Sequence, residues 1–158
     1  MLPQQLQNLI SQFTRLPGIG PRQAARFIFY LLRNPEEINA LENILAQVRD
    51  DIRLCESCFL PSFIQCRICA DSRRNANLIC IVEKETDAIN LEKTRQFQGH
   101  YFVLGGFIDP LEKDSLAHHR LDALIQRLRK GNLGTELILA LTPRREGDFT
   151  SLYIENML

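Results

Sequence analysis

Four cysteines in two matched pairs constrain this chain more than any other feature. Cys55 and Cys58 are separated by two residues, seven residues follow, and Cys66 and Cys69 repeat the two-residue spacing. Two such pairs supply four thiolates, which can close a tetrahedral structural site around one Zn²⁺ ion per chain. The short interval between the pairs predicts a compact knuckle. A redox role for either pair alone is the alternative, and two matched pairs argue against it.

The composition and the N-terminal sequence indicate the cellular compartment in which this motif is expected. Five cysteines in a reducing compartment indicate metal ligands or buried thiols, and Cys80, which stands apart in an apolar run, is expected to be a small buried side chain. The first ten residues lack the pattern of a signal peptide, and no run of about 18 apolar residues is found. We therefore expect a cytoplasmic chain without a membrane segment.

Hydrophobic periodicity divides the chain into three expected parts: residues 1–53, 54–76 and 77–158. The first part predicts three helices, of which the first runs to about Arg15, the second starts at Pro21 and the third follows Asn34-Pro35. The apolar residues of the third helix are expected to face inward. They are Ile38, Leu41, Ile44, Leu45, Val48 and Ile52.

The last part alternates short apolar runs with helical patterns, which predicts a small, mainly parallel α/β sheet covered on both faces. The expected strands are residues 78–83, 100–104 and 136–141. The helix between the second and third of these strands is expected to be capped by Asp114 and ended by Gly131. A last helix is expected from Asp148. His118 and His119 fall in the middle of the capped helix without a partner and are interpreted as surface or half-buried residues rather than ligands.

The segment "LPGIGP" predicts a tight turn between the first two helices. Gly18 and Gly20 permit positive φ and close backbone approach, while the start of the next helix offers unpaired N–H groups to a phosphate. Arg22 and Arg26 lie four residues apart on that helix, hence on one face. Nineteen basic residues balance nineteen acidic ones overall, yet residues 1–34 contain no Asp or Glu. The pattern resembles a helix–hairpin–helix and favours contact with the DNA backbone over a turn with solvated arginines.

Two acidic positions follow predicted strands. Glu83 ends the first strand, and Glu146 and Asp148 follow the third. Carboxylates at neighbouring strand ends could hold Mg²⁺ for phosphoryl chemistry. The alternative is a polar exit from a buried strand and an ordinary helix start, where acidic residues are favoured.

The order of these motifs, together with "LICIVEKETDAINLEKT", "YFVLGGFIDPL" and "TPRREGDFTSLYI", resembles the bacterial RecR family of recombination mediators from about Leu6 onward. The resemblance implies a helix–hairpin–helix module, a four-cysteine zinc finger and a Toprim domain. It also implies a non-enzymatic DNA repair factor, located with the nucleoid, that forms ring-like clamps and works with RecO and RecF to load RecA onto single-stranded DNA.

The resemblance assigns roles to particular residues. Arg22 and Arg26, with the hairpin glycines Gly18 and Gly20, would contact single- or double-stranded DNA without sequence preference. The four paired cysteines would bind zinc. Glu83 matches the Toprim glutamate, and Glu83, Glu146 and Asp148 are candidates for a partner-docking surface.

Three departures from the family pattern qualify this picture. Thr142-Pro143-Arg144 stands where catalytic Toprim enzymes carry two aspartates, which argues against nuclease chemistry because Mg²⁺ needs carboxylate charge. The loop "EKDSLAH" lacks the glycine-containing turn of the family. The chain stops at Leu158, so we expect a truncated or naturally short form of a homo-oligomer, dimer or tetramer. Two alternatives stay open at this point: a Mg²⁺-dependent Toprim nuclease or phosphotransferase, and a zinc-containing adaptor that does not bind DNA.

Overall fold

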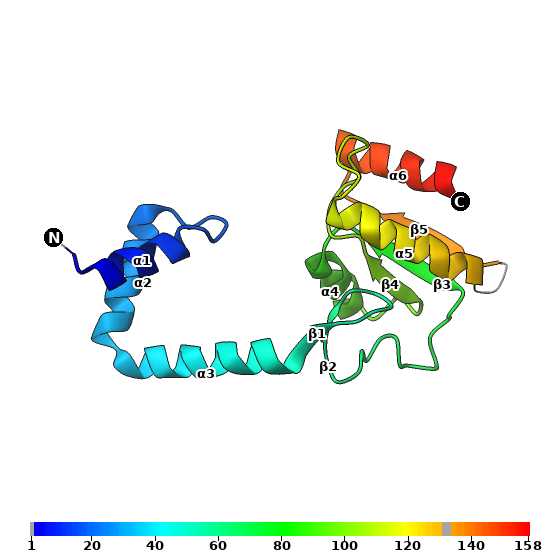
Figure 1. The fold of residues 1–158 in the computed structure, drawn as a ribbon. Helices are drawn as coiled ribbons and strands as arrows, with labels where there is room; N and C mark the ends of the chain where they lie inside the picture. The colour runs from blue at the N-terminus through cyan, green and yellow to red at the C-terminus, as the bar shows by residue number, and fades with distance from the viewer. Residues whose placement is uncertain (1, 131–133) are drawn as a thin grey trace. The chain divides into compact units, whose positions relative to one another are not determined.

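The computed structural model describes residues 2–130 and 134–158, and the chain divides into two compact units at the Asp51–Ile52 boundary (Figure 1). The first unit is helical. The second contains the four cysteines and a parallel sheet with helices, so the expected fold class is confirmed. In this division the cysteine loop belongs to the same unit as the sheet. The separate boundary expected between residues 76 and 77 stays a prediction.

The first unit consists of α1 (Gln4–Phe13), α2 (Pro21–Arg33) and α3 (Pro35–Asp51). Proline stands at the start of α2 and of α3, where its missing N–H costs no hydrogen bond. The α1 helix ends slightly before Arg15, and the chain continues through a hydrogen-bonded turn in which the Ile19 N–H donates to the Leu16 carbonyl at 3.1 Å. Ala24 and Ile28 are the buried residues of α2.

The expectation that the apolar stripe of α3 faces inward is wrong. No residue of this helix is buried, and Ile44 and Leu45 are each 57% exposed. Ile52, assigned to the same stripe, belongs instead to a strand. Periodicity identifies side chains that share a helix face, but that face is buried only where another layer covers it. Within the first unit, α2 does not cover it.

The second unit begins with a two-stranded antiparallel sheet, β1 (Ile52–Leu54) and β2 (Pro61–Phe63), that sequence analysis did not predict. A three-stranded parallel sheet follows in the order β4-β3-β5, formed by β3 (Leu78–Val82), β4 (His100–Val103) and β5 (Glu136–Ala140). Its helices are α4 (Glu85–Lys93), α5 (Leu116–Lys130) and α6 (Arg145–Met157).

The central strand β3 buries both of its faces. Ile79 and Ile81 pack with Phe102 of β4 under α5 and α6, whereas Cys80 and Val82 point to the opposite face, toward α4 and the cysteine loop. Side chains of a strand alternate between faces, so a strand that is covered on both sides reads as a continuous apolar run. Figure 1 shows α5 and α4 on opposite sides of the sheet.

Several local expectations about α5 and α6 need correction. The cap of α5 is Ser115 rather than Asp114, because the Ser115 hydroxyl accepts the His118 N–H at 3.4 Å. His118 lies in the first turn of α5, is buried, and packs edge-to-face on Tyr153, whereas His119 is exposed. The α6 helix begins at Arg145 rather than Asp148. Gly131, expected to end α5, lies outside the described residues.

Candidate metal centre and nucleic-acid interface

The structure brings the four paired cysteines together. The sulfur atoms of Cys55, Cys58, Cys66 and Cys69 all lie within 4.8 Å of one another. Two of these separations are 3.8 Å, between Cys55 and Cys69, and 3.6 Å, between Cys58 and Cys66. A tetrahedron with metal–sulfur bonds of about 2.3 Å has sulfur–sulfur edges of about 3.8 Å. The four thiols therefore fit a single tetrahedral metal ion.

Tight backbone turns hold the first cysteine pair. The Cys55 N–H donates to the Leu60 carbonyl at 2.9 Å, and the Phe59 N–H donates back to the Cys55 carbonyl at 2.8 Å. Phe59 adopts a φ of 61°, a left-handed conformation that closes the turn. The second pair is closed by the Ala70 N–H, which donates to the Cys66 carbonyl at 2.9 Å. We call residues 55–70 the knuckle.

The thiols of the knuckle differ in acidity. Burial raises the pKa of Cys55, but hydrogen bonds from the N–H groups of Ser57 and Cys58, together with hydrogen bonds to the Cys58 and Cys69 thiols, outweigh it and bring the pKa below its usual value. A hydrogen bond with Cys69 and burial raise the pKa of Cys58, and burial raises the pKa of Cys66. A metal ion would bind the thiolate forms and displace these protons.

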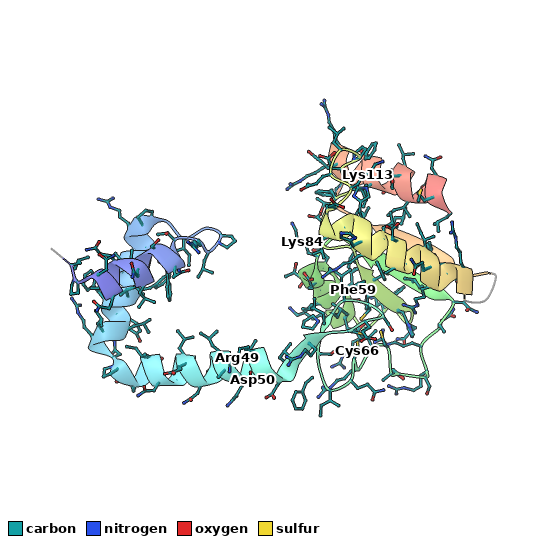
Figure 2. All side chains as sticks on the ribbon, in the orientation of Figure 1. Arg49, Asp50, Phe59, Cys66, Lys84 and Lys113 are labelled. Atoms are coloured by element: carbon teal, nitrogen blue, oxygen red, sulfur yellow. The ribbon has the colours of Figure 1, made fainter. Side chains whose placement is uncertain are left out.

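The knuckle is attached to the parallel sheet through backbone and side-chain contacts. The Val103 N–H of β4 donates to the Cys58 carbonyl at 3.0 Å, and Arg127 of α5 donates to the Ser57 carbonyl at 2.9 Å. Arg120, also on α5, stacks over the ring of Phe59 at 4.6 Å, and its guanidinium donates to the Val103 carbonyl at 3.2 Å (Phe59 is labelled in Figure 2). The knuckle and the sheet therefore share one core.

The glycine hairpin between α1 and α2 has the geometry expected from its sequence. Gly18 adopts a φ of +80°, a conformation that a residue with a side chain adopts only under strain. Gly20 forms the N-cap of α2 and supplies no side-chain cap, so the N-terminus of this helix is not covered by its own cap residue. Both glycines have open space around their Cα atoms, and Arg22 and Arg26 are exposed. All four residues are thus open to solvent, and residues 1–34 contain no Asp or Glu.

Glu83 at the carboxyl end of β3 is buried, with 4% of its surface exposed. One carboxylate oxygen pairs with the Lys84 ammonium at 2.8 Å, and the other accepts the Thr142 hydroxyl at 2.6 Å. Burial raises the pKa of Glu83, but the hydrogen bonds from Lys84 and Thr142, together with the positive charges of Lys84 and Arg144, outweigh it, so the pKa lies below its ordinary value. Both oxygens of this carboxylate are therefore engaged by the protein itself.

Glu146 and Asp148 lie on the first turn of α6 and are exposed. Gly147 between them packs so closely on the Thr142 carbonyl that a Cβ atom would clash with it. Within residues 2–130 and 134–158, the four cysteines are the one group of three or more potential metal ligands whose donor atoms lie close enough to hold a single ion. The structure does not assemble Glu83, Glu146 and Asp148 into a cluster of that kind.

Comparison with known proteins places the chain in a family. The model described as "RecR, helix-hairpin-helix" matches residues 6–49, and a Toprim domain model matches residues 77–158. Recombination protein RecR of Mycobacterium leprae is 43% identical over 158 residues, which cover 97% of this chain and 78% of that protein. Recombination protein RecR of Prochlorococcus marinus is 43% identical over 152 residues, covering 95% and 80%. The chain belongs to the RecR family.

The resemblance to RecR noted from the motifs is thus confirmed. In this RecR-family chain, the helix–hairpin–helix match lies in the first unit and the Toprim match covers the parallel sheet of the second. Among the described residues, no helix combines the length and apolar character needed to cross a membrane.

Sequence reasoning missed two residues with structural roles in this RecR-family chain. One contacts the knuckle, and the other pairs with Glu83 at the carboxyl end of β3. Arg120 lies on the amphipathic α5 and reads as a surface charge, yet it is 4% exposed. Lys84 follows Glu83 directly in the sequence, and its ammonium pairs with the buried carboxylate at 2.8 Å. The only signal that could have indicated Lys84 is its adjacency to the strand-ending glutamate.

Proposed function

We propose that this chain is a non-enzymatic DNA-binding factor of recombinational repair. Membership of the RecR family supports a role in recombination. The observation that carries the DNA proposal is the open hairpin: Gly18, Gly20 and the start of α2 offer backbone N–H groups, and Arg22 and Arg26 extend the positive field along the same helix.

The contact chemistry is that of the phosphate backbone. Exposed arginines and a helix N-terminus recognise phosphate oxygens and carry no base information. We therefore propose binding to both single- and double-stranded DNA without sequence preference, by a protein located with the nucleoid in the cytoplasm. In this proposal RecO and RecF act with the chain to load RecA, and Glu83, Glu146 and Asp148 contribute to the surface on which such partners dock.

The proposed metal is Zn²⁺, one per chain, in a structural role. Four thiolate donors with tetrahedral separations are typical of structural zinc sites, in which no coordination position is left for a substrate. The residues present fit this ion. Its contribution in the proposal is to hold the two ends of the knuckle together.

The absence of enzymatic activity is also a proposal, and the environment of Glu83 supports it. Lys84 and Thr142 engage the two oxygens of the carboxylate, and Arg144 adds further positive charge nearby. A divalent ion at this edge would have to displace an ammonium group. Mg²⁺-dependent nicking of plasmid DNA that disappears in Glu83→Ala would contradict the proposal.

Self-association is proposed from the apolar surface of the first unit. Exposed side chains on α2 and α3 include Tyr30, 55% exposed, and Leu32, 53% exposed, in addition to the stripe of α3. Native mass spectrometry reports the bound metal and the number of copies in one measurement. One zinc ion per chain in a dimer or tetramer is expected, and a zinc-free folded monomer would contradict both parts.

The DNA proposal is tested by fluorescence anisotropy with labelled single- and double-stranded oligonucleotides across a salt series. Affinity should fall steeply with salt, and the double variant Arg22→Gln/Arg26→Gln should weaken binding to all sequences alike. The slope of log K against log salt should decrease by about 0.7 to 0.9 for each arginine that contacts a phosphate. Arg129→Gln, an exposed position on α5, is the matched control. Equal binding by the double variant and the control would overturn the hairpin assignment.

A further inference from the structure

The second unit contains a groove beside the metal centre, with which it shares one lining residue, Cys66. It has a volume of about 500 Å³. One wall is residues 60–68 of the knuckle, which include β2, and the other is one side of α4. An adjoining hollow of about 320 Å³ continues it along α4 toward Arg95, and the two share Leu60, Ile68, Ile89 and Glu92. Together they form one surface, which we call the knuckle groove.

The floor of the knuckle groove is aliphatic. Leu60 and Ala88 are buried and belong to the core that joins the knuckle to the sheet, with Ile68 packed against them. Ile89 on α4 and Phe63 at the end of β2 line the groove with 44% and 57% of their surface exposed. Side chains this large and this exposed on a concave surface provide contact area that stays open to solvent in the isolated chain.

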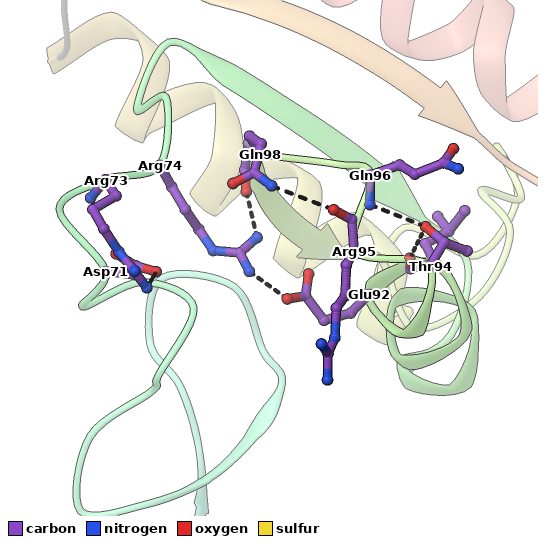
Figure 3. Close-up of polar contacts among 10 residues, drawn as sticks. Asp71, Arg73, Arg74, Glu92, Thr94, Arg95, Gln96 and Gln98 are labelled. Carbon is purple, nitrogen blue, oxygen red and sulfur yellow. Dashed lines mark hydrogen bonds and ion pairs between the residues drawn. The ribbon is translucent and has the colours of Figure 1, made fainter.

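The rim of the groove is cationic. Arg67, Lys93 and Arg95 line it and are exposed. The single carboxylate in the lining is Glu92, which forms an ion pair with Arg74 (Figure 3). Arg74 also donates to the Gly99 carbonyl at 3.1 Å, so this pair is anchored to the protein and does not neutralise the rim.

We propose that the knuckle groove docks a short acidic segment of a partner protein, with aliphatic or aromatic side chains seated on the floor and flanking carboxylates on the rim. Charge complementarity selects an anionic occupant, since three cations face the groove and the one lining acid is already paired. An apolar floor selects a segment that carries hydrophobic anchors. Binding at this surface does not depend on the proposed function of the hairpin, which lies in the other unit.

The floor argues for a peptide over single-stranded nucleic acid. Sequence-tolerant binding of single strands relies on aromatic side chains on which successive bases stack. Among the residues that line the groove, Phe63 is the aromatic one, and the others on the floor are aliphatic. An aliphatic trough between basic side chains matches leucine, isoleucine or phenylalanine between acidic residues.

The test uses the full chain, labelled with ¹⁵N and loaded with zinc, and a pool of synthetic heptapeptides. These carry Asp or Glu at the four outer positions and Leu, Ile or Phe at the three inner ones. A second pool, with Lys in place of every acid, is the charge-reversed probe. The acidic pool should shift the backbone amide signals of Leu60, Phe63, Ile68 and Ile89, while the basic pool should leave them unchanged. No shift at millimolar peptide, or equal shifts with both pools, would overturn the proposal.

Variants separate the groove from the rest of the surface. Ile89→Asp and the double variant Arg67→Glu/Lys93→Glu should each weaken binding of the acidic pool by about tenfold or more, since a central anchor or two rim charges are removed. Leu152→Asp on α6, where Leu152 is 58% exposed, is the matched control and should bind as the parent does.

Oligothymidylate is titrated in parallel. Shifts of the groove amides by the oligonucleotide and not by the acidic pool would assign the surface to nucleic acid and refute the peptide.

Discussion

The two units of this chain differ in how completely each covers its own apolar surface. In the second unit both faces of the central strand β3 are covered, and Ile81, Val82 and Val103 are fully buried, although Ile138 of the outer strand β5 is 39% exposed. In the first unit Ala24 and Ile28 are buried, whereas Tyr30 and Leu45 are more than half exposed. The second unit therefore has an extensive core of its own and exposes apolar side chains such as Phe63 and Ile89 around it, whereas the first buries few residues and exposes much of its apolar surface.

The largest expected effect tests whether the knuckle is part of the core of the second unit. Cys66→Ser, or removal of the metal by a chelator, should destabilise the second unit by at least about 3 kcal/mol, because metal binding supplies folding free energy to such sites. The loss should appear in the amide signals of β3 and β4 as well as in those of the knuckle. Cys80→Ala, which alters a buried cysteine outside the cluster, should cost about 1 kcal/mol and leave the metal content unchanged. If the sheet keeps its stability without metal, the knuckle is not part of the core of the second unit.

The next effect concerns Arg120, which joins the knuckle to the sheet. Arg120→Met should cost about 2 to 4 kcal/mol in urea unfolding, because it removes a buried cation together with its contacts to Phe59, Val103 and Glu85. Arg129→Met on the same helix changes an exposed residue and should stay within about 0.5 kcal/mol. Similar values for the two variants would show that Arg120 is not a structural link.

A smaller effect is expected in the first unit, where burial and exposure can be compared directly. Ala24→Leu should cost about 1 to 3 kcal/mol, since Ala24 is fully buried and a larger side chain would overpack its surroundings. Leu45→Ser should cost less than about 0.5 kcal/mol in dilute solution, monitored by circular dichroism. If Leu45→Ser proves as costly, and the cost depends on protein concentration, another copy covers α3.

The smallest expected effect is a pH dependence from Glu83. The pKa of Glu83 is lower in the folded chain than the ordinary value of 4.5, because Lys84 and Thr142 hold the carboxylate form. Its contribution to stability is therefore present above pH 4.5 and is lost as the pH falls through the lower folded-state value. The difference in unfolding free energy between the parent and Glu83→Gln, about 1 kcal/mol or less at pH 7, should shrink toward pH 3. A difference that stays constant over this range would exclude the carboxylate contact as its source.

Sequence reasoning succeeded where a physical constraint acts over a short span. Cysteine spacing is enough to predict a common metal site for Cys55 and Cys69, and continuous apolar runs predict strands such as β3 because both of its faces are buried. The hairpin glycines were likewise recognisable, since Gly18 has the positive φ that such a turn requires.

What could not be predicted depends on contacts between distant segments. The exposure of the α3 stripe depends on whether a second layer covers it, which periodicity does not report. The burial of Arg120 arises because the knuckle, about sixty residues earlier in the chain, places Phe59 beneath its guanidinium. The β1–β2 pair is three residues long on each side, too short for an alternation pattern to be recognised.

The hydrogen bond from Val103 to Cys58 has a consequence for the solubility of the chain. β4 and β5 are the outer strands of the three-stranded sheet, and the knuckle lies along part of the β4 margin. Outer strands with unpaired backbone groups recruit strands from other molecules and promote aggregation. By holding the knuckle closed, a bound metal ion would shield this margin from other chains, so metal starvation would favour intermolecular β-pairing as well as local unfolding.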